Sequence, residues 1–446
     1  MKRTFLLLLA YWRARRLRFA SRAALERHQA RRIARFTATV CRRSRYFGPF
    51  HGMPLAQWPI MDKAVMIANF DAMNTAGIRL TDVLEAALRA EQSRDFTPTI
   101  GDITVGLSSG TTSQRAAFAV SAAETARWAG IMLAKALPGG LFSGERVALF
   151  LRANSNLYTA VRTPWLSFTF FDLFEPIDRL ADAAVQYNPT IIVAPAQVLR
   201  QLALGVTEGK LALSPKKVIS AAEVLEPQDK AIIARAFGTV HEIYQATEGF
   251  LASTCEHGVL HLNEEYVHVE TQWLDKSARR FVPVITDFSR LIQPIVRYRL
   301  DDVLVARAEP CTCGRASLAL EQIEGRCDDM LELPGLGSEK IKVFSDVLTR
   351  ALAQALPFDC DYRLAQTSQS ELSLQVALDA AAFERVRLHV ESVLHGLGVD
   401  AARLSWVHVD TIPVFDATRK RRRIVRQAAR HATDNADASS TAMAAP

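Results

Sequence analysis

The expected fold rests on one stretch, KVISAAEVLEPQDKAIIARAFGTVHEIYQATE, which covers residues 217–248. It opens with the run Lys217-Val218-Ile219-Ser220, which is typical of a buried strand. A helical stretch follows from Pro227 to Phe237, with the proline near the first turn, where proline is tolerated. The chain then returns to a strand at Glu242-Ile243-Tyr244. Strand, helix and strand at this spacing predict crossover units and an α/β core.

The segments on either side extend this pattern and then change it. Two apolar runs, residues 147–151 and 190–194, are expected to be buried strands of the same core. From about residue 328 the character changes. Residues 372–376 alternate apolar and polar side chains, residues 380–395 are helical, and residues 406–409 return to a strand. This order predicts a second, compact α+β domain.

We divide the chain of 446 residues into four parts. Residues 1–50 are a basic helical segment, residues 51–326 a large domain, and residues 327–430 the small domain. Residues 431–446 lack core-forming side chains, so we expect a disordered tail.

Positive charge is concentrated at the two ends of the chain. Residues 1–45 hold fourteen Lys and Arg against one acidic residue, Glu26, and a second basic run covers residues 419–423. Because these two segments carry more positive charge than the net charge of +7 of the whole chain, the middle of the chain is mildly acidic. The apolar run at residues 5–10 is too short to span a bilayer and precedes arginines instead of a cleavage site. We expect the N-terminal segment to pack on its own domain, with peripheral contact to an anionic membrane as the alternative.

Six cysteines are scattered along the chain, too few for a disulfide scaffold, which favours a reduced, cytoplasmic setting. Two of them form the tight pair Cys311-Thr312-Cys313-Gly314. Thiolates and imidazole suit tetrahedral zinc, so Cys255 with His257 or His261 could complete four ligands. Such a metal would be structural, and the alternative is two reduced cysteines in a turn.

Several short segments carry residues suited to nucleotide chemistry, although each alone fits an ordinary loop or surface. Around Gly110, hydroxyls and backbone N–H groups could face phosphate oxygens; this turn consists of Ser108, Ser109, Gly110, Thr111 and Thr112. Tyr244 can stack on a nucleobase, and the carboxylate of Glu248 can hold Mg²⁺. Asp302 can accept ribose hydroxyls. No GxxxxGK[ST] or GxGxxG signature is present.

The remaining two segments are GRCDDM, residues 325–330, at the change of composition, and Lys420 inside the C-terminal basic run. A lysine on a second domain could neutralise charge on a reacting carboxylate and α-phosphate. Five motifs occur in the order found in the acyl- and aryl-CoA ligase superfamily of adenylate-forming enzymes. They are SSGTT (residues 108–112), YxxTE (244–248), YRxxD (298–302), GRxDDM (325–330) and the late Lys420. Over residues 55–425 the chain most resembles the phenylacetate–CoA ligase, coenzyme F390 synthetase and CapK branch.

The resemblance implies a large multi-sheet α/β domain with a small mobile α+β domain, and an enzyme that uses ATP and Mg²⁺. It implies that residues 108–112 form the phosphate loop, that Glu223 lies at the adenine side and that Tyr244 stacks on adenine. It further implies that Thr247 contacts the α-phosphate and Glu248 holds Mg²⁺. The other implied roles are ribose binding by Asp302, nucleotide proximity for Arg326, a hinge at Asp328 and adenylation by Lys420. Members of this branch often carry a similar CxCG turn, which supports the zinc hypothesis.

Departures from the common pattern concern glycines and one cation. Many members have Gly, Pro and Lys or Thr at the positions of Ser113, Arg115 and Ala116. The loop therefore lacks its usual cation, and Arg115 could substitute for that charge. Three positions where members commonly have glycine carry Gln245, Asp301 and Arg419. We expect these replacements to affect the rate of catalysis more than the binding of nucleotide.

The resemblance implies that the substrate is a small carboxylic acid and the acceptor is CoA or an acyl carrier protein. Aromatic residues at 165–171 suit an aryl or other apolar acid, and equally an ordinary core. One alternative is transfer of AMP to a hydroxyl, as in F390 synthetase. Another is a non-catalytic protein that binds nucleotide or membrane. Nucleic acid is not an expected partner, because aromatic residues suited to RNA do not alternate with the basic runs.

Overall fold

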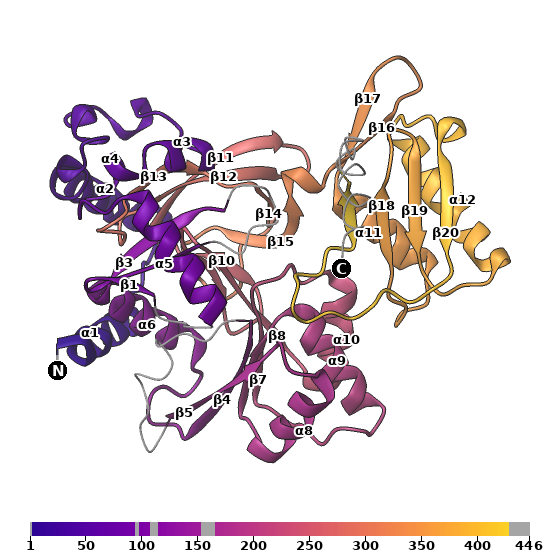
Figure 1. Cartoon of the computed structure of the whole chain (residues 1–446), viewed down its shortest axis with the longest axis horizontal. Helices are drawn as coiled ribbons and strands as arrows, with labels where there is room; N and C mark the ends of the chain where they lie inside the picture. The colour runs from indigo at the N-terminus through magenta and orange to yellow at the C-terminus, as the bar shows by residue number, and fades with distance from the viewer. Residues whose placement is uncertain (1, 94–97, 108–114, 153–165, 428–446) are drawn as a thin grey trace, which may run out of the picture. The chain divides into compact units, whose positions relative to one another are not determined.

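The computed structural model describes residues 2–93, 98–107, 115–152 and 166–427 (Figure 1). Internal contacts divide the chain into two compact units. The large unit comprises Met1–Glu324 together with Asp416–Arg421, and the small unit comprises Gly325–Phe415 with Arg422–Pro446. The predicted tail, residues 431–446, lies outside the described part of the chain.

A sheet of twelve strands runs through the large unit, as far as the described residues define it. Five neighbouring strands are parallel, in the order β5-β4-β6-β7-β8. They are β4 (Glu145–Leu151), β5 (Leu166–Asp172), β6 (Ile191–Ala194), β7 (Lys217–Ser220) and β8 (Val240–Ala246). Helices α8 (Ile177–Tyr187), α9 (Ala196–Thr207) and α10 (Pro227–Phe237) make the crossovers. The α/β prediction is confirmed. Helix α10 begins at Pro227, which is tolerated in the first turn, and ends at Phe237, because Gly238 adopts φ of 76° at the C-cap.

Beyond β8 the sheet becomes antiparallel, in the order β8-β9-β10-β15-β14-β12-β11 with β13 also on β12. These strands are β9 (Gly249–Thr254), β10 (Leu260–Leu262), β11 (Val267–Asp275), β12 (Arg280–Asp287), β13 (Ile295–Arg299), β14 (Asp302–Ala306) and β15 (Ala319–Arg326). Their apolar faces build a core that includes Phe281, Ile285 and Leu304. A separate three-stranded sheet consists of β1 (Thr99–Ile100), β2 (Ile103–Leu107) and β3 (Ala117–Ser121).

Two helices form the N-terminal segment, α1 (Lys2–Arg16) and α2 (Arg22–Thr39). Helix α1 packs on α6 (Ala122–Ala136) and buries Leu7 and Tyr11. Gly130 of α6 permits this close approach, because a β-carbon there would overlap the carbonyl oxygen of Leu7. The expected packing of the segment on its own domain is thus present. The remaining helices of this region are α3 (Lys63–Ala68), α4 (Phe70–Met73) and α5 (Leu80–Ser93).

The small unit has a four-stranded sheet in the order β20-β19-β18-β21. Its strands are β18 (Arg363–Gln366), β19 (Glu371–Gln375), β20 (Ser405–Val409) and β21 (Ile424–Arg426), with a hairpin of β16 (Leu331–Pro334) and β17 (Lys340–Val343). Helices α11 (Ser345–Ala355) and α12 (Ala380–Gly396) pack on the sheet through Leu348, Val390 and Leu394. Across the described residues, no helix is long and apolar enough to cross a membrane.

Candidate nucleotide site and metal centre

Polar side chains gather where the parallel strands end. Arg152 follows β4, Gln197 lies in the first turn of α9 after β6, and Glu223 follows β7. Ser220 of β7 pairs with Glu242 of β8, so Glu223 and Tyr244 lie just beyond this register at the same edge. In α/β sheets, the carboxyl edge of parallel strands is where ligands bind.

Tyr244 and Asp302 meet although 58 residues separate them. The Tyr244 hydroxyl donates a hydrogen bond of 2.5 Å to Asp302 Oδ2. Tyr244 is buried at the end of β8, and Asp302 begins β14, so the two sheet regions each supply one partner. A ring and a carboxylate are therefore held side by side, which suits recognition of a nucleoside.

Glu248 occupies the two-residue turn between β8 and β9, next to Thr247. Its carboxyl group is buried and accepts a hydrogen bond from the hydroxyl of Tyr298. Burial raises its pKa, and the negative charge of Asp302 acts in the same direction, while Arg290 opposes the rise. A buried carboxylate whose charge is only partly balanced favours a bound cation.

The turn itself is fixed by two neighbours. Arg290 donates a hydrogen bond of 3.0 Å to the Thr247 carbonyl oxygen. Gly249 follows the turn, where a β-carbon would lie 2.7 Å from Asp287 Oδ2, so only glycine fits there without displacement. Burial raises the pKa of Asp287 to about 6.

Glu223 is the centre of a polar network in the large unit. Its carboxylate accepts hydrogen bonds from Arg152 Nη2 at 2.6 Å and Gln197 Nε2 at 2.8 Å, and from the Arg421 backbone N–H at 3.3 Å. The preceding Ala222 has φ of 67°, a left-handed conformation that is strained for a residue with a β-carbon. The loop after β7 is thus held in a conformation that directs Glu223 toward the segment Asp416–Arg421.

The arginines of the basic run near the C-terminus are mostly paired with buried or half-buried acids. Arg421 pairs with Asp229 of α10, and in the small unit Arg422 pairs with Asp329 and Arg423 with Asp361. Arg423 is only 2% exposed. The side chain of Lys420 is exposed, and the residue belongs to the segment that groups with the large unit.

Other predicted residues are distributed as follows. Residues 108–112 of the predicted phosphate loop lie outside the described part of the chain. Arg326 and Asp328 belong to the small unit, where Arg326 ends β15 and Asp328 lies in a single 3₁₀ turn. Among the predicted acid-pocket aromatics, Phe168 and Phe171 are buried in the core, and Phe171 stacks on Phe150 with ring centroids 4.6 Å apart.

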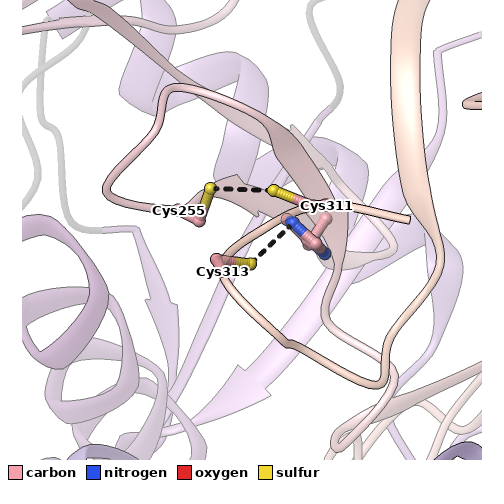
Figure 2. Close-up of side chains that lie close together, drawn as sticks. Cys255, Cys311 and Cys313 are labelled. Atoms are coloured by element: carbon pink, nitrogen blue, oxygen red, sulfur yellow. Dashed lines mark hydrogen bonds between the residues drawn. The ribbon is translucent and has the colours of Figure 1, made fainter. Parts of the chain in front are cut away.

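A second constellation lies between β9, β10 and the loop before β15, and it brings together Cys255, His261, Cys311 and Cys313 (Figure 2). All four ligand atoms lie within 4.8 Å of one another. The two sulfurs of Cys255 and Cys311 are 3.8 Å apart, and Cys313 Sγ lies 3.4 Å from His261 Nε2. For tetrahedral zinc with Zn–S of about 2.3 Å and Zn–N of about 2.0 Å, these edges should be about 3.8 and 3.5 Å. The residues present therefore fit a zinc ion.

The surroundings of this cluster also suit a metal. His261 Nδ1 lies 3.3 Å from the Ser317 carbonyl oxygen, so a proton on Nδ1 donates to that oxygen and leaves Nε2 to bind metal. Burial lowers the pKa of His261, which keeps the ring neutral. Of the two candidate histidines, His261 sits in β10 among the cysteines, whereas His257 is exposed in the preceding turn.

These features define an α/β protein with a polar site at the carboxyl edge of its parallel strands. No family profile and no curated protein matches the sequence. Solved structures do match. A 2-hydroxyisobutyryl-CoA ligase in complex with 2-HIB-AMP gives a TM-score of 0.65 at 20% identity, covering 94% of this chain and 92% of that chain.

Two further structures share the fold over a smaller part of the chain. The amide bond synthetase McbA from Marinactinospora thermotolerans gives a TM-score of 0.51 at 15% identity, covering 71% of this chain and 68% of that one. The anthranilate CoA ligase AuaEII in complex with anthranoyl-AMP gives 0.50 at 15%, covering 72% and 66%. The chain therefore has the fold of adenylate-forming acyl- and aryl-CoA ligases.

Several site residues escape sequence reasoning. Arg152, Gln197 and Asp229 contact the segment that carries Lys420, yet none belongs to a recognisable motif. Asp287, which lies against Gly249, has no pattern of its own, and the YRxxD motif that contains Tyr298 does not reveal its hydrogen bond to Glu248. One available signal was position, because Arg152 and Gln197 both follow predicted strands of the parallel core, where site residues are expected.

Proposed function

We propose that the protein activates a small carboxylic acid with ATP as an acyl-adenylate and then transfers the acyl group to a thiol. The observation that carries this proposal is the meeting of Tyr244, Asp302 and Glu248 at the carboxyl edge of the sheet. These three supply an aromatic face, an acceptor for hydroxyls and a buried anion, which are the groups that a magnesium–nucleotide complex needs.

The chemistry consists of two displacements. A carboxylate oxygen of the acid attacks the α-phosphorus of ATP, the bond to the bridging oxygen breaks, and pyrophosphate leaves with the electron pair. A thiolate then attacks the acyl carbon, and AMP leaves. The protein's own part is to hold the reactants and balance charge: Lys420 would lie against the carboxylate and α-phosphate, and Thr247 against the phosphate.

Glu248 would hold Mg²⁺, since its buried carboxylate lies close to the second negative charge of Asp302 and accepts a hydrogen bond from the neutral hydroxyl of Tyr298. Bound Mg²⁺ would neutralise phosphate charge. Within the shared fold we propose the phenylacetate–CoA ligase and F390 synthetase branch, with an aryl or other apolar acid as substrate and CoA or a carrier protein as acceptor. The ordered motifs support the branch, and the half-buried Phe170 beside the buried Phe168 and Phe171 supports the apolar acid.

Pyrophosphate exchange into ATP over a panel of aryl and fatty acids tests this function. We expect exchange that depends on one class of acid and on Mg²⁺, followed by thioester formation when CoA or a carrier protein is added. Exchange with no acid, together with intact ATP binding, would instead indicate a non-catalytic nucleotide-binding protein. AMP transferred to a hydroxyl compound would indicate F390-synthetase-like chemistry.

Replacing Asp302 by alanine should weaken ATP binding about ten- to hundredfold, because hydrogen bonds to a charged acceptor contribute about 1.5–3 kcal/mol. Calorimetric titration of ATP measures the change. Asp301→Ala is the matched control, since the neighbouring Asp301 forms an ion pair with Arg299 and has no assigned contact with the nucleotide. Equal affinities for the Asp302 variant and the wild type would contradict the assigned role.

We propose that Cys255, His261, Cys311 and Cys313 hold a structural zinc ion. Four protein ligands fill a tetrahedral site, so such an ion has no open position for catalysis. It would tie the turn after β9, strand β10 and the loop before β15 together.

We also propose that α1 contacts an anionic membrane surface. Phe5, Leu8 and Trp12 are exposed at helical spacing, with 66%, 38% and 46% of their surface accessible. All fourteen basic residues of positions 1–45 are exposed as well. Basic and aromatic side chains on the outer face of a helix that is already packed through its inner face suit an interfacial position.

Vesicle sedimentation tests the membrane contact. The wild type should bind vesicles containing phosphatidylserine and bind pure phosphatidylcholine far more weakly. Changing Phe5 and Trp12 to serine should reduce binding roughly tenfold, because apolar area that enters the interface is lost. Phe142→Ser is a matched control, since Phe142 is 70% exposed elsewhere on the large unit. Equal binding of the double variant and the wild type would contradict the proposal.

A further inference from the structure

The segment Asp416–Arg421 carries Lys420 and is bound to the large unit through its backbone. Arg152 Nε donates to the Ala417 carbonyl oxygen at 2.8 Å, and Arg152 Nη2 donates to the Arg419 carbonyl oxygen at 2.6 Å. Gln197 Nε2 donates to the same Arg419 oxygen at 2.8 Å. The Arg419 carbonyl oxygen, directly before Lys420, therefore accepts hydrogen bonds from two side chains of the large unit.

The residue after Lys420 is held at both its backbone and its side chain. The Arg421 N–H donates to Glu223 Oε1, and the Arg421 guanidinium pairs with the carboxylate of Asp229. The backbone on each side of Lys420 is therefore anchored, while the lysine side chain itself is exposed. This arrangement fixes where the Lys420 amine can reach.

Asp229 is a specific anchor and not a surface charge. Its side chain is fully buried in the first turn of α10, and it also pairs with Arg200 of α9, whose Nε lies 3.4 Å from Asp229 Oδ1. A buried carboxylate needs such partners, because without them its desolvation is not compensated. Arg421 supplies one of the two guanidinium groups from almost 200 residues further along the chain.

We propose that Asp229 and Glu223 are positioning residues that hold the 416–421 segment so that Lys420 is presented to the reacting carboxylate and α-phosphate. Asp229 anchors the segment by its side chain at Arg421, and Glu223 anchors it by its backbone. Glu223 thereby acts through this segment, in addition to any contact with adenine. The inference rests on the proposed function, because it assigns Lys420 its part in adenylation.

Two variants release the anchor in different ways. Asp229→Asn removes the buried charge but also leaves Arg200 without it, which could disturb the packing of α9 and α10. Arg421→Gln removes only the Arg421 guanidinium group and keeps the Arg200–Asp229 ion pair intact. Glu145→Gln is the matched control, because Glu145 is a buried acid of the same unit that pairs with Lys216 at 3.5 Å.

Limited trypsin digestion measures how firmly the 416–421 segment is held, and this measurement does not depend on catalytic activity. Cleavage after Arg419 and Lys420 should accelerate about tenfold or more in both anchor variants, because proteolysis follows local opening. The Glu145 variant should cleave like the wild type. Unchanged cleavage in Arg421→Gln would overturn the proposal, whatever the protein catalyses.

The two half-reactions separate positioning from general damage. Acid-dependent pyrophosphate exchange should fall about tenfold or more in Arg421→Gln, since small misplacements of a catalytic group have large effects on rate. Thioester formation from the same acid supplied as its acyl-adenylate should stay within about twofold. Loss of both half-reactions together would overturn the positioning role. A wild type that exchanges pyrophosphate with no acid would refute the proposed function instead, and the trypsin result would still stand.

Discussion

Replacing Lys420 by alanine is expected to reduce acid-dependent pyrophosphate exchange by a factor of about 10² to 10³ and to leave ATP binding nearly unchanged. The amine would neutralise charge that develops between the carboxylate and the α-phosphate, and removal of one such donor typically has an effect of this size. ATP affinity should persist, because Tyr244, Asp302 and Glu248 are untouched. Exchange kinetics and calorimetric titration of ATP measure the two quantities.

Arg419→Ala provides the control for this experiment. Arg419 is adjacent to Lys420 and its side chain is 87% exposed, whereas its contacts with Arg152 and Gln197 use only its backbone carbonyl. Its replacement should therefore preserve exchange. Full adenylation by Lys420→Ala would show that another cation does this work. The three arginines that follow are poor candidates, since each is paired with an acid.

Removing zinc is expected to produce the second large effect, on stability. The purified protein should contain about one equivalent of zinc, and Cys311→Ser or a strong chelator should remove it. An ion present at a thousand times its dissociation constant stabilises the folded state by about 4 kcal/mol, so its loss should lower the melting temperature by several degrees. Elemental analysis and calorimetric unfolding make these measurements.

Cys360→Ser separates the metal effect from the loss of any thiol. Cys360 is half-buried in the small unit, and it does not belong to the cluster of Cys255, His261, Cys311 and Cys313. This variant should keep its zinc and its melting temperature to within a degree or two. Protein prepared with zinc in the medium that still contains no metal, and a Cys311 variant as stable as the wild type, would each refute the structural site.

Much of the fold follows from local sequence. The runs at 147–151, 190–194 and 217–220 are strands because short apolar segments of this kind fit a sheet covered on both faces, and proline at 227 fixes the start of α10. The alternating residues 372–376 likewise coincide closely with β19, Glu371–Gln375. These signals lie within a few residues of one another, so periodicity alone reveals them.

The contacts that build the candidate site are different in kind. Arg421 and Asp229 are 192 residues apart. The sequence of a basic run does not show whether its side chains are solvated or paired with acids. Spacing could not choose between His257 and His261 either, because the choice depends on which residue enters β10. Arg297, in the YRxxD region, binds Glu270 and the carbonyl oxygens of Ala56 and Trp58, so it supports the fold there. Such partners are set by tertiary packing.

The three successive arginines pair with acids of different units, and this restricts how the chain can vary in length at this point. Arg421 is committed to one unit and Arg422 to the other, so no spare residue lies between the two anchors. An insertion of one residue after Arg421 would separate the two anchors by up to about 3.8 Å of additional backbone, so that one of the two ion pairs would be strained or lost. We therefore expect the chain length at this junction to be restricted, because each of the two neighbouring arginines is already paired.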